Sequence, residues 1–179
     1  FFQSGLQSGR DSQGMFETHP QVGGGVLSFD GVGDYIDLGR TLTYANDFSL
    51  EWWQKYPGGN WLPICGIDST DSVQWKDANT ILVRIDDDPG DEITVPSSAG
   101  EWHHFVLVRS SDVLNIYRDG VDVEDPKTAA GNFEVRYIGS DYLAGFFDGE
   151  LDGVRIYDKA LTPEEVTKNH NGSKGRHKN

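Results

Sequence analysis

Short apolar runs separated by turn residues make up the middle of this chain. Between Phe48 and Tyr56, Phe, Leu and Trp alternate with Ser, Glu and Trp, and a period of two places successive side chains on opposite faces of a strand. Similar runs cover residues 26–29, 35–38, 64–67, 80–85, 102–109, 114–118, 121–123, 136–139 and 151–157. Roughly ten strands at this spacing predict an all-β, antiparallel sandwich or jelly roll. No segment of helical period interrupts them, which argues against a parallel α/β sheet.

The strongest turn signal lies between two of these runs. The pair Asp119-Gly120 tolerates the positive φ angles that a two-residue type I′ turn requires. The sequence therefore predicts a β-hairpin that joins 114–118 to 121–123.

One short helix is predicted near the C-terminus, over residues 162–169. Thr162 can act as N-cap, Pro163 occupies the first helical position and Glu165 the third, which is the pattern of a capping box. Leu161 and Val166 are placed to form a hydrophobic staple across this start. We expect the helix to close onto the sandwich and to have a structural role.

Length and local composition predict one folded domain with a tail at each end. A chain of 179 residues has the size of one ordinary domain. Residues 1–14 are rich in Gln, Ser and Gly, and we interpret them as a flexible lead-in or a tag remnant. The domain is assigned to 15–169, and 170–179, which contain no acidic residue, to a basic tail.

The chain is strongly acidic. Its 29 Asp and Glu against 15 Lys and Arg give a formal net charge of −14. This balance argues against a nucleic-acid partner and against docking on anionic lipid, and no apolar run reaches the ~18 residues of a membrane helix. The single Cys65 excludes an internal disulfide and a multi-cysteine zinc site, and its apolar surroundings predict a buried side chain.

Several segments, taken in chain order, resemble the laminin-G-like domains of the concanavalin A-like lectin/glucanase superfamily. They are VLSFDG at 26–31, DYIDLG at 34–39, FSLEWW at 48–53, EWHHF at 101–105, LNIYRDG at 114–120, YIGS at 137–140, FDGELDGVRIY at 147–157, and Ala160-Leu161 followed by EEV at 164–166. The resemblance implies a two-sheet antiparallel jelly roll with one short C-terminal helix. It also implies a non-catalytic module of an extracellular or cell-surface protein. Trp52 departs from the family, which usually has a small residue there.

The resemblance also implies one structural Ca²⁺ ion. Carried over to matching positions, Asp152 would bind the ion through its side chain, and Asp30 or a backbone carbonyl near Gly25 would bind it from the opening strand. Irregular backbone beside acidic side chains can supply the six to eight oxygens that calcium takes. The alternative is that Asp152 caps a turn or pairs with Arg155.

The acidic residues do not predict an enzyme. Related glucanases carry Glu-x-Asp-x-Glu on one strand, whereas Glu150 and Asp152 are followed here by Val154, and the paired carboxylates of a retaining glycosidase are therefore incomplete. No nucleophile elbow, phosphate loop or Cys–His pairing stands out. We expect a non-catalytic domain, with a glycosidase as the weaker alternative.

Three aromatic residues are the candidate ligand contacts. Trp61 follows Gly-Gly-Asn, Trp75 lies in a polar stretch that we interpret as a loop, and Tyr142 lies in a later loop. Aromatic faces stack on sugar C–H surfaces, and neighbouring Asp, Asn and Gln side chains bind hydroxyl groups. The alternative for each ring is packing, and Trp53 and Trp102 are predicted core residues.

These observations favour carbohydrate binding outside the cell, with a glycan as partner. A structural or protein-adhesion module of a cell surface, fibre or virion, with a surface protein as partner, is the alternative. Accessible aromatic rings beside polar groups would indicate carbohydrate binding, whereas an apolar interface patch would indicate the structural or adhesion module.

Overall fold

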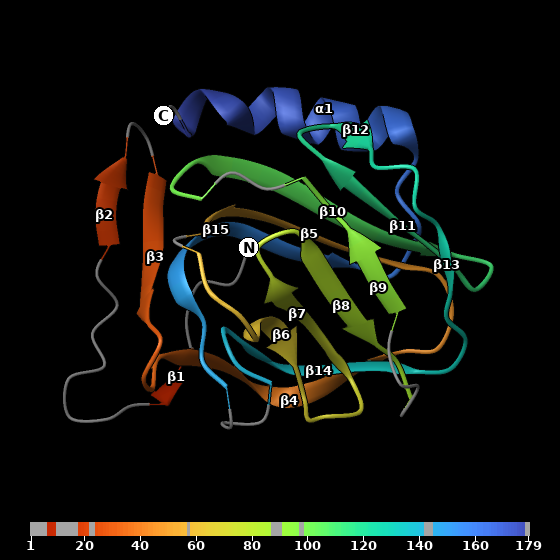
Figure 1. Cartoon of the computed structure of the whole chain (residues 1–179), viewed down its shortest axis with the longest axis horizontal. Helices are drawn as coiled ribbons and strands as arrows, with labels where there is room; N and C mark the ends of the chain where they lie inside the picture. Colours follow the sequence, from red (N-terminus) through yellow and green to blue (C-terminus); the bar gives the residue numbers. More distant parts are fainter. Residues whose placement is uncertain are drawn as a thin grey trace.

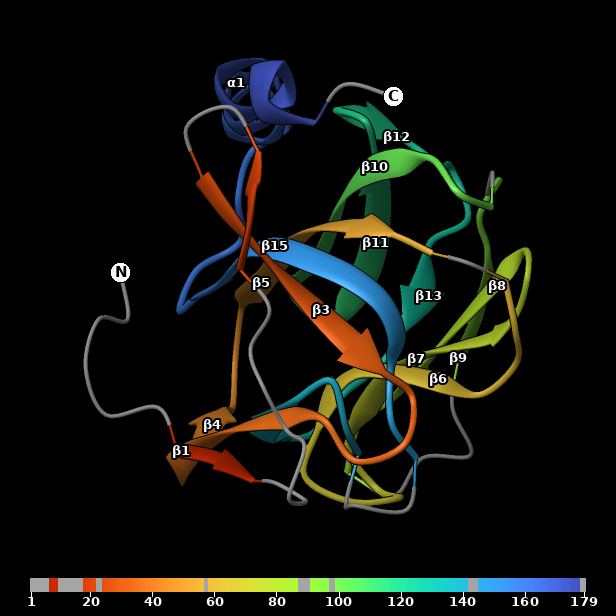
Figure 2. The same cartoon turned by 90° about the vertical axis from the view of Figure 1, so that its left-hand side faces the viewer.

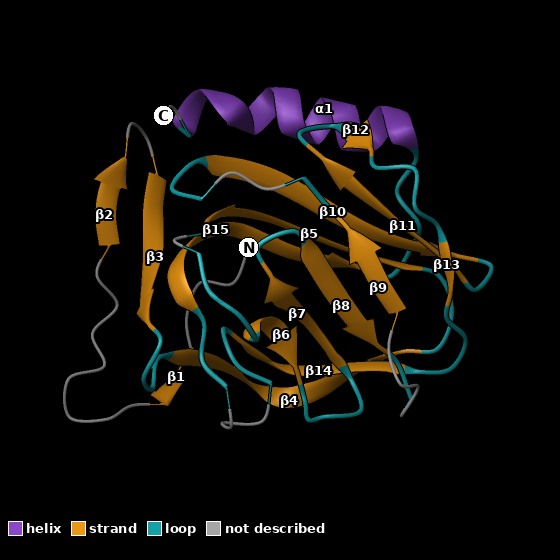
Figure 3. Ribbon diagram, viewed as in Figure 1, coloured by secondary structure: helices purple, strands orange, loops and turns teal. Residues whose placement is uncertain are grey.

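Two antiparallel β-sheets packed face to face form the described part of the chain (Figures 1 and 3). The computed structural model describes residues 7–9, 18–21, 24–56, 58–86, 91–96, 99–141 and 145–177, with the backbone alone for 7–9, 18–21 and 24–25. The predicted all-β sandwich with one C-terminal helix is confirmed.

The strands fall into a seven-stranded and an eight-stranded sheet. In spatial order, the seven-stranded sheet contains β1 (Gln7–Gly9), β4 (Tyr35–Tyr44), β14 (Phe133–Ile138), β6 (Leu62–Gly66), β7 (Ser72–Asp77), β8 (Thr80–Arg84) and β9 (Asp91–Thr94). The eight-stranded sheet contains β12 (Val121–Asp122), β11 (Val113–Arg118), β10 (Trp102–Ser110), β5 (Phe48–Lys55), β15 (Asp148–Tyr157), β3 (Gly24–Asp30) and β2 (Thr18–Gln21), and β13 (Lys127–Thr128) also pairs with β11. Part of the predicted lead-in, Gln7–Gly9, thus pairs with β4.

The predicted hairpin joins β11 to β12. Arg118 pairs with Val121, and the two residues between them have positive φ angles, 53° at Asp119 and 83° at Gly120. Both values are those of a type I′ turn, so the turn chemistry of the sequence determines this register.

Aromatic side chains fill the space between the sheets. Trp52, where the family usually has a small residue, is fully buried and stacks on Phe105 at 5.5 Å between ring centroids. Its indole Nε1 donates to Oε1 of Gln54 at 2.7 Å, and the same oxygen accepts from Nε1 of Trp75 at 3.1 Å. The large ring is tolerated because a buried amide oxygen satisfies both indole donors.

Helix α1 (Pro163–Ser173) covers the side of the eight-stranded sheet that points away from the seven-stranded sheet (Figure 2). The predicted capping box of Thr162 and Glu165 is confirmed, and Val166 packs with Val106 and Val108 of β10. The helix ends at Ser173 instead of 169, and a 3₁₀ turn, η1 (Lys174–Arg176), follows. Most of the segment assigned to a basic tail is therefore helical, and its Ser173 and His177 are buried. Among the described residues, no helix combines the length and the hydropathy of a membrane span.

Candidate functional site

The outer face of the seven-stranded sheet carries an unusual set of polar side chains. In β7, Val73 and Trp75 belong to the core, so Ser72 and Gln74 point to the opposite face. In β8, Val83 belongs to the core, and its neighbours Leu82 and Arg84 likewise point outward. We call the surface formed by Pro63, Ser72, Gln74, Leu82, Arg84 and Tyr137 the outer face.

Strand register fixes how these side chains lie beside one another. One row across four strands runs Tyr137, Gly66, Ser72 and Arg84. The next row runs Pro63, Gln74, Leu82 and Glu92. Cross-strand neighbours are about 5 Å apart, so the side chains of each row lie side by side. Arg84 and Tyr137 are partly exposed, whereas Pro63, Ser72, Gln74 and Leu82 are buried.

The outer face contains polar side chains that make no hydrogen bond within the described residues. Ser72 is fully buried, and its Oγ has no hydrogen-bond partner. Within the described ranges, no side-chain hydrogen bond or ion pair is recorded for Gln74, which is 3% exposed, or for Arg84. Because buried polar atoms are normally hydrogen-bonded, such a group marks a place where water or a polar ligand belongs.

Asp141 adds a carboxylate beside this surface. A β-carbon added to Gly145 would lie 3.2 Å from its Oδ1 and 3.5 Å from Pro63, so Asp141 and Pro63 are close together. Burial raises the pKa of Asp141, and backbone N–H groups and the charge of Arg84 offset this only in part. The surface therefore offers both hydrogen-bond donors and acceptors.

Aromatic rings gather at the β4 and β14 end of the outer face. Tyr35 meets Tyr137 edge-on at 5.6 Å and lies 6.3 Å from Phe146. All three are partly exposed. Arg136 holds this end in place, because it makes two 3.0 Å hydrogen bonds to Asp37 and lies over the ring of Tyr137.

Trp61 lies directly before β6, two residues before Pro63 of the outer face. Its side chain is 52% exposed, and its φ angle is +60°. A left-handed backbone is uncommon for a bulky residue, and such strain is found at functional sites. The predicted loop position and exposure of Trp61 are therefore observed, whereas its contact with a ligand stays a prediction.

Trp75 is not available to a ligand. It lies in β7, is fully buried, and its ring stacks on Tyr56 at 5.0 Å. The interpretation of this stretch as a loop was wrong because Gln74 and Lys76 are the outward positions of a strand with period two. Tyr142, the third aromatic candidate, lies outside the described residues.

The three positions predicted to bind calcium do not converge. Asp30 pairs with Asp148 and Leu27 with Leu151, so continuing this register by one residue brings Asp152 next to Val26. The four residues between Val26 and Asp30 span about 13 Å, so Asp30 and Asp152 cannot share one ion. Gly25 is the nearer position, one residue beyond Val26.

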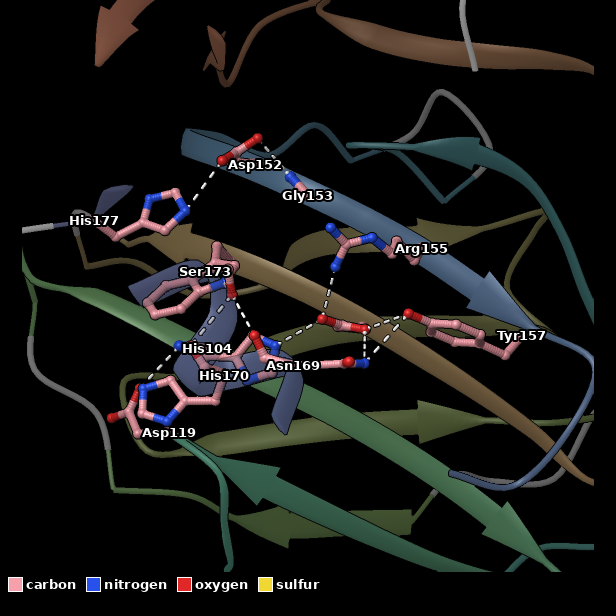
Figure 4. A network of polar contacts seen from close by, with 12 residues as sticks. His104, Asp119, Asp152, Gly153, Arg155, Tyr157, Asn169, His170, Ser173 and His177 are labelled. Carbon is pink, nitrogen blue, oxygen red and sulfur yellow. Dashed lines mark hydrogen bonds and ion pairs between the residues drawn. The ribbon is translucent and has the colours of Figure 1, made fainter. Parts of the chain in front are cut away.

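The contacts of these acids also differ from those of calcium ligands. Asp152 Oδ2 lies 3.1 Å from Nε2 of His177, and its Oδ1 accepts the N–H of Gly153 at 2.7 Å (Figure 4). Asp30 accepts the N–H groups of the turn that follows it, Val32 at 2.9 Å among them. Among the described residues, no three His, Cys, Asp or Glu side chains lie close enough to hold a metal together. The donor set thus does not fit a calcium ion in this conformation.

A buried polar network beneath α1, which the sequence did not indicate, surrounds Glu51 (Figure 4). Its carboxylate is fully buried and accepts from His104 at 3.0 Å, Arg155 at 2.8 Å, Tyr157 at 2.6 Å and Asn169 at 2.9 Å. Burial alone would raise the pKa of Glu51, but these donors outweigh it and the pKa is lowered. Burial and the neighbouring carboxylate raise the pKa of Tyr157 to about 12.

This network is structural. Glu51 has four hydrogen-bond donors and no exposed surface, so it offers no place for a substrate or a reacting water. No sequence motif marks it, because its members come from β5, β10, β15 and α1. The predicted pair of Asp152 with Arg155 is also absent, since Arg155 binds Glu51 instead.

Many solved structures share the fold, and three of them illustrate its range. Domain 4 of AbnA, an extracellular GH43 arabinanase from Geobacillus stearothermophilus in complex with arabinotriose, is 20% identical with a TM-score of 0.68 over 92% of this chain and 86% of that one. The ligand-binding domain of botulinum neurotoxin serotype D in complex with N-acetylneuraminic acid is 11% identical, with a TM-score of 0.69 over 94% of this chain and 46% of that one. A heptameric SAP-like pentraxin from Limulus polyphemus is 18% identical, with a TM-score of 0.61 over 79% of both chains.

Sequence comparison identifies the family. Among curated proteins, none matches this sequence significantly. A family profile described as laminin G 3, of the concanavalin A-like lectin/glucanases superfamily, matches residues 30–167, most of the chain. The chain therefore belongs to this laminin G family of the concanavalin A-like superfamily.

Proposed function

We propose that this domain is a non-catalytic carbohydrate-binding module of an extracellular or cell-surface protein. Its ligand is an oligosaccharide that lies along the outer face, with one end against Trp61 and the other toward Tyr35 and Phe146. Two of the structural neighbours described above are complexes with a sugar, arabinotriose in one and N-acetylneuraminic acid in the other.

The exposed, left-handed Trp61 is the observation that carries this proposal. A half-exposed indole contributes little to the core, so the backbone strain beneath it is not explained by packing. The side chains of Ser72, Gln74 and Arg84 lie on the same sheet face and make no hydrogen bond within the described part of the chain, and the charge of Arg84 acts on the nearby Asp141. Aromatic stacking with hydrogen bonds to hydroxyl groups is how such a surface holds a sugar.

A glycan array, probed with and without calcium, tests the proposal. The wild-type domain should bind at least one class of glycan, and Trp61→Ala should weaken that binding by more than ~1 kcal/mol, roughly fivefold. Val32→Ala is the matched control, since Val32 is 72% exposed on the turn after β3. Binding of a protein partner and of no glycan would replace this function with the adhesion module.

A further inference from the structure

A second candidate site, separate from the outer face, is a hollow at an open edge of the sandwich. A hollow of about 650 Å³ is lined by residues of β9 and the loop after it, and by β11, β12 and the segment that follows β12. In Figure 1 the upper end of β9 faces β11 and β12, beneath the helix. The volume is in the range of small-molecule sites, and none of the outer-face residues contributes to it.

Arg118 is held in position at one side of this hollow. Nδ1 of His103 lies 2.8 Å from Oδ2 of Asp119. Nη2 of Arg118 lies 3.0 Å from Nε2 and 3.3 Å from Nδ1 of the same imidazole, so the guanidinium packs against the ring. Nδ1 carries a proton and donates it to Asp119, because an ionised carboxylate can only accept a hydrogen bond. The chain Asp119–His103–Arg118 thus orients the cation before any ligand arrives.

The guanidinium retains unused donors. Its Nε is buried without a hydrogen-bond partner, and its nearest carboxylate oxygen, Oδ2 of Asp119, is 3.5 Å away. Within the described part of the chain, Nη1 of Arg118 makes no hydrogen bond or ion pair. Because Asp119 already compensates the charge, Arg118 offers hydrogen bonds more than a net positive field.

The rest of the lining combines apolar and acidic side chains. Val121, 68% exposed, Val123 and Pro96 form the apolar part. Asp122 and Glu124 add carboxylates. These acids and the net charge of −14 would repel a negatively charged ligand. The hydroxyl groups of a neutral ligand, in contrast, can accept hydrogen bonds from Arg118 and donate them to the carboxylates.

We propose that this hollow is a second ligand site, which binds one neutral sugar unit. Its C–H face packs on Val121 and Val123, and its hydroxyl groups bridge Arg118 and the carboxylates. The ligand class rests on the proposed function, but the residues are separate from Trp61, so the two sites can be tested apart. Two sites on one domain would let it hold two parts of a polysaccharide at once.

NMR titration of the labelled full chain tests this site. The reporters are the methyl groups of Val123 for the hollow and the indole N–H of Trp61 for the outer face. The neutral probes are maltotriose, xylotriose, mannotriose and arabinotriose, and the anionic probe is trigalacturonic acid. At least one neutral probe should shift Val123, and trigalacturonic acid should not.

Two variants separate this site from the first. Val121→Asp removes the apolar wall at an exposed position, and Arg118→Lys keeps the charge but loses the planar fork. Each should weaken the Val123 response about tenfold and leave the Trp61 response unchanged, and Val32→Asp, at another exposed valine, should alter neither.

The outcomes that overturn the proposal are distinct. Neutral probes that shift Trp61 but not Val123 overturn the second site and leave the proposed function intact. Trigalacturonic acid that shifts Val123 as strongly as the neutral probes overturns the ligand class. A response of Val123 that survives Val121→Asp and Arg118→Lys places the bound sugar elsewhere. A response at neither reporter overturns the second site and counts against the first.

Discussion

At the scale of single residues, two tryptophans in similar polar surroundings have opposite fates. Trp61 is half exposed, and Trp75 is fully buried. The difference arises from backbone conformation: Trp75 alternates with Gln74 in a regular strand, whereas Trp61 has a φ angle of +60° after two glycines with positive φ. Only the first ring is therefore free to contact a ligand.

Trp75→Ala should destabilise the domain without affecting the outer face directly. The substitution removes a fully buried ring that stacks on Tyr56 and meets Phe105 edge-on, so the free energy of unfolding should fall by roughly 3–5 kcal/mol. Denaturant unfolding measures the loss. Trp61→Ala is the control and should change that free energy by less than about 1 kcal/mol; the reverse order of the two losses would contradict the assignment of core and ligand ring.

Glu51 should make the domain sensitive to acid. Its pKa is lowered in the folded state, so its contribution to stability is fully present above the unfolded value, near 4.5, and is lost as the pH falls through the folded value. Asp119 and Asp152 also have lowered pKa values, because hydrogen bonds from His103 and His177, together with nearby positive charge, outweigh burial. Both residues add to the same acid slope.

Glu51→Gln tests this contribution. The amide removes the charge that His104, Arg155 and Tyr157 surround, which should cost about 3 kcal/mol at pH 7. The free energy of unfolding of the variant, measured between pH 7 and 3, should fall less steeply below pH 4.5 than that of the wild type. Glu164→Gln, an exposed acid in the first turn of α1, should leave both values nearly unchanged; equal acid slopes in Glu51→Gln and wild type would rule out this role.

At the scale of elements, α1 is a fixed cover on the eight-stranded sheet. Its first turn is locked by the capping box, and its last turn by Ser173, whose Oγ accepts from Nε1 of Trp53 at 3.0 Å. His177 then stacks on Trp53 at 4.3 Å. These contacts explain why the helix continues past residue 169, where local sequence signals end.

Thr162→Ala should loosen the first turn of this helix. It removes the oxygen that accepts the N–H of Glu165 at 3.3 Å, and loss of an N-cap costs about 1 kcal/mol. The free energy of unfolding should fall by that amount, while hydrogen exchange speeds up in the first turn of α1. Thr162→Ser keeps the hydroxyl and should restore most of the loss; a Ser variant as unstable as the Ala variant would mean that the cap contributes nothing.

At the scale of the whole molecule, local signals predicted the fold and long-range contacts determined the sites. The period of two, the Asp119-Gly120 turn and the capping box each depend on a few adjacent residues, and all were confirmed. The hollow around Arg118 requires the edge of one sheet to meet the edge of the other, which no adjacent residues encode. Cys65 was correctly predicted to be buried, and burial raises its pKa to about 12.

The calcium prediction also depends on contacts between distant parts of the chain. Asp152 of β15 is engaged by His177, which follows η1 and lies between Trp53 and Trp102. A calcium ion at Asp152 has to displace this imidazole from the carboxylate. Binding of the ion and docking of the C-terminal segment therefore compete for one side chain.

This competition predicts an order of calcium responses. His177→Ala frees the carboxylate, so calcium should raise its melting temperature more than that of the wild type. The corresponding gain in free energy of unfolding is up to RT ln(1 + [L]/Kd), about 2.7 kcal/mol at a hundredfold excess over Kd. Asp152→Asn removes the ligand and should respond least. Magnesium at equal ionic strength controls for screening of the net charge of −14. Equal responses of all three proteins to both ions would show that calcium acts through screening, and the predicted site at Asp152 would then be wrong.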